Sequence, residues 1–156
     1  MGTTTFSGPV VSQAGFITGT GVVGTSVTSA TLTVTSDLAG QIIPLNRAGG
    51  MTVTLPAATG SQAVYAFLVG TTFTSNGIIQ VANASDTFNG IANVGGGTGS
   101  VFSTLPASDT ITMNGTTTGG LAGSLITVRD VAAGDWIVTA NLIGSGSPAT
   151  PFSAAV

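Results

Sequence analysis

Few residues in this chain could carry out acid–base or metal chemistry. Its 156 residues include five Asp and two Arg, and no Lys, Glu, His or Cys. Two aspartates stand in the same phrase, Ala-Ser-Asp-Thr, at residues 84–87 and 107–110. Paired Asp-Thr sites invite comparison with aspartic proteases, in which two carboxylates share a proton. Those enzymes continue into Gly, which leaves room for the substrate backbone, whereas Phe88 and Ile111 follow here. We therefore expect Asp86 and Asp109 to cap turns through local backbone hydrogen bonds.

Two other catalytic or binding patterns lack the neighbouring elements or residues that their chemistry needs. Residues 19–24 satisfy the G-x-G-x-x-G spacing of dinucleotide sites, but that site needs a helix to follow, and residues 25–28 are Thr-Ser-Val-Thr. Nucleophilic serine chemistry needs a base to take the proton, and the chain has neither His nor Lys. We expect neither a nucleotide site nor a serine nucleophile.

Metal chemistry has little support in the sequence. The His and Cys side chains that bind catalytic zinc are absent. A structural Ca²⁺ held by Asp86 or Asp109 with backbone carbonyls is the one alternative that the aspartates leave open. We expect no enzyme activity, no cofactor, and no catalytic or metal-binding residue.

The low charge of the chain points to a covered surface. Only 4% of the residues are charged, against about 25% in an ordinary soluble domain, and the net charge is −3. So few charges protect poorly against self-association, especially where strand edges are exposed. Copies of the chain or a partner are therefore expected to cover much of it. The lack of Lys argues against nucleic acid, and no run approaches the ~18 apolar residues of a membrane helix. Without a signal peptide at its start, the chain is expected to be made in the cytoplasm.

Composition and periodicity predict an all-β fold, a single antiparallel β-sandwich or barrel of jelly-roll type. Gly, Thr and Ser fill 24, 27 and 15 positions, and no window has helical apolar spacing. A central hairpin is expected to join residues 51–55 to 64–69, and Trp136 to anchor the core. Two further hairpins are predicted at Asn76-Gly77 and at residues 132–134, and a long loop around the glycine run 95–100. The other expected strands are 25–35, 41–45 with Pro44 at an edge or a bulge, 71–75, 78–81, 101–105, 110–113, 125–131 and 135–142.

Both ends of the chain differ in composition from its middle. We expect an extended N-terminal arm over residues 1–24, the β-domain over 25–143, and a Pro/Gly/Ser-rich C-terminal tail over 144–156. Disordered segments are usually poor in large apolar residues, which favours a docked arm over a flexible terminus. The apolar and proline residues of the two ends are the predicted capsid or inter-subunit interface: Phe6, Val10, Val11, Phe16, Ile17, Pro148, Pro151 and Phe152.

Several phrases together resemble small virion proteins of tailed bacteriophages, especially capsid decoration (cement) proteins. They are Gly-Met-Thr-Val-Thr-Leu-Pro-Ala-Ala-Thr-Gly at 50–60, Asp-Thr-Ile-Thr-Met-Asn-Gly-Thr-Thr-Thr-Gly-Gly at 109–120, Gly-Asp-Trp-Ile-Val at 134–138, and Ala-Thr-Pro-Phe at 149–152. The resemblance implies a β-rich homotrimer on the outer surface of the head, where it clamps neighbouring major capsid subunits. It brings no catalytic residue. Its partners would be copies of itself and the major capsid protein.

Two other functions stay open at this point. A trimeric tail-fibre or spike module uses similar Thr-Leu-Pro and Thr-Gly-Gly phrases. A carbohydrate-binding β-sandwich would need exposed aromatic residues, and the chain has one Trp, one Tyr and seven Phe.

Overall fold

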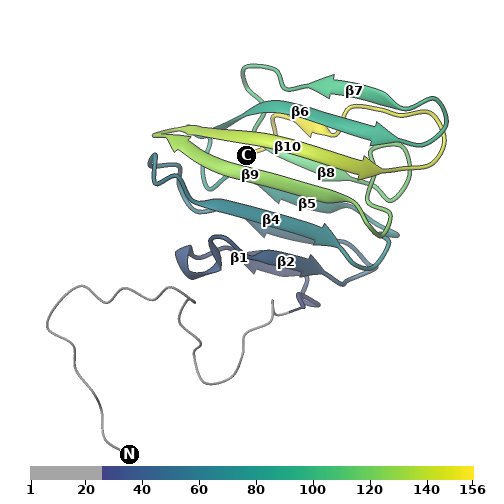
Figure 1. Cartoon of the computed structure of the whole chain (residues 1–156), viewed down its shortest axis with the longest axis horizontal. Coiled ribbons are helices and arrows are strands. Elements are labelled where there is room, and N and C mark those ends of the chain that lie inside the picture. Colours follow the sequence, from purple (N-terminus) through teal and green to yellow (C-terminus); the bar gives the residue numbers. More distant parts are fainter. Residues whose placement is uncertain (1–25) are drawn as a thin grey trace, which may run out of the picture.

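The computed structural model describes residues 26–156 of the chain. The N-terminal arm predicted over residues 1–24 lies outside the described residues, and so do its five interface candidates. Figure 1 shows two β-sheets packed face to face, with strands that are nearly consecutive in sequence lying in opposite layers. The predicted all-β sandwich is confirmed.

Each sheet contains both parallel and antiparallel strand pairs, whereas we predicted antiparallel pairing alone. The connection between β1 and β2 contains a short 3-10 turn, Ser36–Leu38. In spatial order, the five-stranded sheet is β1 (Thr31–Thr33), β3 (Met51–Thr54), β5 (Gly77–Gln80), β8 (Thr110–Met113) and β11 (Phe152–Ser153). The six-stranded sheet is β2 (Ile42–Leu45), β4 (Val64–Val69), β9 (Leu125–Ala132), β10 (Asp135–Ile143), β6 (Thr87–Gly95) and β7 (Ser100–Ser103).

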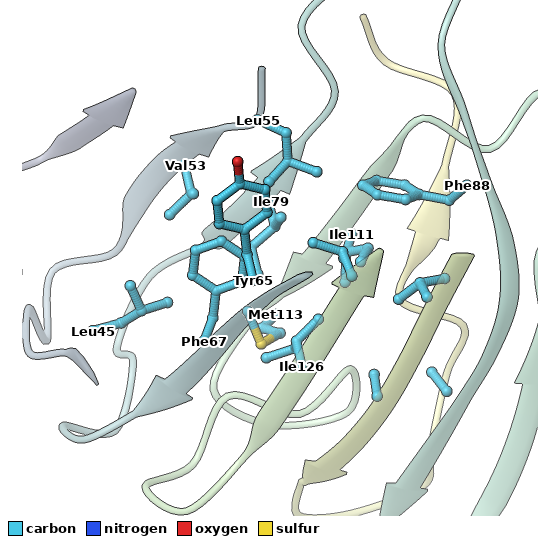
Figure 2. Close-up of a cluster of buried hydrophobic side chains, with 14 of the residues drawn as sticks. Leu45, Val53, Leu55, Tyr65, Phe67, Ile79, Phe88, Ile111, Met113 and Ile126 are labelled. Carbon is cyan, nitrogen blue, oxygen red and sulfur yellow. The ribbon is translucent and has the colours of Figure 1, made fainter. Parts of the chain in front are cut away.

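The core lies between the two sheets and follows from the period of two along each strand. Figure 2 shows apolar side chains from both layers meeting there, with Tyr65 and Phe67 facing Val53 and Ile79. Trp136 is fully buried, as predicted, and its ring centroid lies 6.0 Å from that of Tyr65. The hairpin of β9 and β10, which carries Trp136, is also confirmed.

The predicted central hairpin is wrong, because β3 and β4 lie in different sheets. In opposite layers, the buried Met51 and Val53 of β3 face the buried Tyr65 and Phe67 of β4 across the core. Residues 55–63 therefore cross from one layer to the other, with Leu55 buried on the way.

The predicted hairpin at Asn76-Gly77 is also wrong. Gly77 begins β5, which pairs in parallel with β3, and residues 71–75 form no strand. The buried ring of Phe73 lies against Gly77, where a Cβ would collide with it. Phe73 thus fills the core from a loop, a position that its local sequence does not reveal.

The glycine run is a short turn and not a long loop. β6 covers nine residues and pairs in parallel with β10 along its whole length, so only residues 96–99 are left for the turn. Polar Asn89 and Asn93 and the strand glycine Gly90 hide the alternation of the buried Phe88, Ala92 and Val94. Pro44 does lie on an edge strand, as predicted, because β2 ends its sheet.

Candidate interaction surface and buried aspartates

One face of the six-stranded sheet points away from the core, and no element among residues 26–156 packs on it. We call it the outer sheet face. Its large aliphatic side chains are exposed: Ile42 by 57%, Ile91 by 41%, Val101 by 63%, Ile137 by 43% and Ile143 by 45%. The strand register sets them among smaller apolar and neutral polar residues: Pro44, Val64, Ala66, Leu68, Leu125, Thr127, Thr139, Asn141, Asn89, Asn93, Gly95 and Ser103.

The charged groups of this face gather where β9 turns into β10. Arg129 and Asp135 are both there, and Arg129 Nη2 donates to Gln62 Oε1 at 2.7 Å. Farther along the sheet, Asn93 Nδ2 donates to Asn141 Oδ1 at 3.0 Å, so these two amides partly satisfy each other within the face. Most of the outer sheet face is therefore uncharged and inexpensive to remove from water.

The interface residues predicted in the C-terminal tail have different positions. Pro151 and Phe152 are buried against the chain's own fold, with Phe152 in β11 beside β8, whereas Pro148 is half-buried. The backbone carbonyl of Pro151 accepts from Thr112 N at 2.8 Å. Phe6, Val10, Val11, Phe16 and Ile17 lie outside the described residues. Within the described chain, Pro148 thus keeps more exposed surface for a partner than its two neighbours in the prediction.

Asp130 holds the loop between β3 and β4. Asp130 as a whole is 2% exposed, and its carboxylate accepts backbone N–H bonds from Thr59, Gly60 and Ser61 at 2.7–3.1 Å. The hydroxyls of Thr59 and Ser61 donate to it as well, at 3.2 and 2.6 Å. Gln62 follows at φ 64°, the left-handed region that non-glycine residues seldom adopt. The loop therefore bends around a buried anion.

These bonds also set the acidity of Asp130. Burial is the largest single influence and opposes ionisation, but the Ser61 hydroxyl and the backbone N–H groups of Ser61, Gly60 and Thr59 together outweigh it. They lower the pKa of Asp130 from 3.8 to about 2. A carboxylate with several N–H donors is stabilised in its charged form. Asp130 is thus ionised in the folded chain at neutral pH.

Acid should weaken the fold through Asp130. Folding lowers the pKa of this carboxyl, so its contribution is complete above the unfolded-state value near 4 and is lost as the pH falls toward about 2. The shift corresponds to about 2 kcal/mol. We expect the free energy of unfolding to fall by that much more in the natural chain than in Asp130→Asn between pH 5 and pH 2. Urea titrations at several pH values measure this difference, and parallel pH profiles of the two proteins would contradict it.

Asp86 and Asp109 bind distant segments and do not act as the local turn caps that we predicted. Asp86 Oδ2 accepts from the backbone N–H of Ala58, in the β3–β4 loop, at 2.9 Å. Asp109 accepts from Ala155 N at 2.7 Å and Val156 N at 3.2 Å, which fastens the end of the chain. Tight burial explains the difference, since both side chains point inward and must find donors there.

The same contacts bear on the suggested Ca²⁺ site. The oxygens of Asp86 and Asp109 face N–H donors, whereas a calcium site presents oxygen ligands to the ion. Within residues 26–156, no three His, Cys, Asp or Glu side chains gather closely enough to hold a metal ion.

In the same part of the chain there is no helix with the length and apolarity that a membrane crossing needs.

Sequence reasoning missed Asp130, although a signal was present. Ile126, Val128 and Asp130 alternate along β9 and share its inward face. A charged residue that continues a buried stripe needs several donors, which the loop at residues 59–61 supplies.

Comparisons with known protein families, with curated proteins and with solved structures found no match to this chain.

Proposed function

We propose that this chain is a structural virion protein of a tailed bacteriophage, which decorates the exterior of the head as a homotrimer and clamps neighbouring major capsid subunits. The observation that carries the proposal is the outer sheet face, where exposed aliphatic side chains lie among neutral polar ones. A surface of this kind is typical of a protein that works while covered by copies of itself or by a partner.

Burial of this face would supply binding energy without a charge partner. Apolar area removed from water contributes about 25 cal/mol per Å², and a stable interface buries about 800 Å² on each partner. The rigid sheet presents Ile91 and Ile137 with little conformational entropy to lose.

The distribution of aromatic residues favours decoration over the carbohydrate-binding alternative. Trp136 and Tyr65 are buried, and the exposed large apolar side chains of residues 26–156 are all aliphatic. Stacking on sugar rings uses exposed aromatic faces, which this part of the chain does not offer. A tail-fibre or spike module would also be trimeric, so the binding experiment below has to separate it from a head protein.

Two measurements test the proposal in sequence. Light scattering on a sizing column should give three times the chain mass of 15.1 kDa. The purified protein should then co-sediment with expanded phage heads that lack their decoration protein, and saturate at a fixed number of copies per head. A trimer that ignores heads would point to a fibre or spike module, and a monomer that ignores them would overturn the proposal.

A charge placed on the outer sheet face should disrupt the assembly. Ile91→Lys puts an ammonium in β6, where its cross-strand neighbours Thr139 and Ser103 carry no charge and burial without a partner costs several kcal/mol. We expect head binding, trimer formation, or both to weaken by a factor of about 100 or more. The matched control is Leu105→Lys, which charges a 73% exposed leucine in the loop after β7. Equal binding by the two variants would remove the outer sheet face from the proposal.

A further inference from the structure

At one side of the sandwich, the core is open between the edge strands of the two sheets. β1 and β2 lie together there, at the lower edge in Figure 1. Between them is a groove of about 320 Å³, room for roughly ten water molecules at about 30 Å³ each. Ile43 forms part of its wall and is 3% exposed, while other apolar side chains of the wall are half-buried and pack on the core: Val27, Leu32 and Leu38.

The chain reaches this groove as part of a regular coil. From β1 to β5 each strand lies in the sheet opposite to the one before it and pairs in parallel with the strand two places away. The coil continues upstream of β1, because Val27 N donates to Pro44 O and Val27 O accepts from Asn46 N, both at 2.8 Å. This parallel bridge places residue 27 on the free edge of β2.

The next position of the coil is the free edge of β1. Within residues 26–156, no strand pairs with that edge. The connections of the coil, residues 34–41, 46–50, 55–63 and 70–76, are eight, five, nine and seven residues long. A connection of the same length before Ser26 would put the end of the preceding strand between residues 16 and 20. Phe16 and Ile17 are the large apolar residues at the N-terminal end of that window.

We propose that the groove between β1 and β2 is the seat of the chain's own residues 16–18, which extend the five-stranded sheet alongside β1. Because side chains alternate along a strand, either Phe16 or Ile17 enters the groove and closes the core. The chain's own segment has the advantage over a second copy, since the short connection keeps it at a high effective concentration near the groove. The segment would also cover an edge that otherwise invites pairing with other chains.

This inference does not depend on the proposed virion function. It assigns the part of the arm nearest the domain to the chain's own fold. The residues left to reach a capsid or a neighbouring subunit are then Phe6, Val10 and Val11.

Thiol labelling of the full chain tests the inference cleanly, because the natural sequence has no Cys. Thr28→Cys places a single thiol in the wall of the groove. A maleimide probe should label it at least about tenfold more slowly than in the same chain carrying Phe16→Asp and Ile17→Asp, since an occupied groove must open before the thiol reacts. The protection should not change with protein concentration.

A matched control uses the distal arm. Val10→Asp with Val11→Asp, in the Thr28→Cys background, should leave the labelling rate as slow as in the parent. Three outcomes overturn the inference: equal rates with and without the changes at residues 16 and 17, loss of protection in the distal control, or protection that grows with protein concentration, which would assign the groove to a second copy. Circular dichroism confirms that each variant is folded before its rate is read.

Discussion

Replacement of Asp130 by Ala should lower the free energy of unfolding by about 3–5 kcal/mol, because several partly buried hydrogen bonds lose their shared acceptor at once. The backbone N–H groups of Thr59, Gly60 and Ser61 all donate to this carboxylate. Among residues 26–156, none of the three donates to another acceptor. Hydrogen bonds to a charged group contribute about 1.5–3 kcal/mol each, although opening of the loop to water would recover part of that loss. Urea unfolding at pH 7 measures the change.

Two further variants sharpen this test. Asp130→Asn keeps one acceptor oxygen but turns an N–H group toward the loop amides. We therefore expect this variant to be less stable than the natural chain and more stable than Asp130→Ala. Asp37→Ala removes an exposed carboxylate from the 3-10 turn and should change stability by no more than about 0.5 kcal/mol. Amide exchange should accelerate at residues 59–61 in Asp130→Ala. Similar losses in the Asp37 and Asp130 variants would show that the carboxylate bonds do not stabilise the loop.

The sequence was sufficient to predict strands wherever burial follows a simple alternation. β8 matches the prediction at both ends, and the β9–β10 hairpin was predicted to within about one residue, because alternating apolar residues meet across a glycine-containing turn. Local patterns do not say which strand lies beside which. Met51–Thr54 and Val64–Val69 were both predicted as strands, yet the partners of the first are β1 and β5 and those of the second are β2 and β9.

The candidate surface was harder to predict than the fold. The low charge of the sequence indicated that some surface is covered, but it did not indicate where. The outer sheet face arises only from the register, which brings Ile42 of β2 and Ile91 of β6 into one cross-strand row through β4, β9 and β10. The tail shows the opposite case, since Phe152 was predicted as an interface residue and is buried beside β8.

Gly115→Ala should lower the free energy of unfolding by about 3 kcal/mol. Gly115 has φ +77°, and a Cβ added there would be driven into the backbone oxygen of Phe73. The left-handed backbone costs a non-glycine residue about 1–2 kcal/mol, and an overpacked site costs about 1–3 kcal/mol more. The turn cannot move away easily, because Gly115 N donates to Gly119 O at 2.8 Å and Phe73 N donates to Gly120 O at 2.9 Å.

Two other glycines separate the two parts of that cost. Gly40 has the same φ of +77° with nothing within 4 Å of an added Cβ, so Gly40→Ala should lose only about 1–2 kcal/mol. Gly95 lies in β6 outside the left-handed region, and its Cβ would meet Leu142 O at an ordinary 3.6 Å, so Gly95→Ala should stay within about 0.5 kcal/mol of the natural chain. Urea unfolding ranks the three variants. If Gly115→Ala lost no more stability than Gly40→Ala, the turn at residues 114–120 would have room to move away from Phe73. Close packing of this turn against the Phe73 backbone could then not be what holds Phe73 in the core.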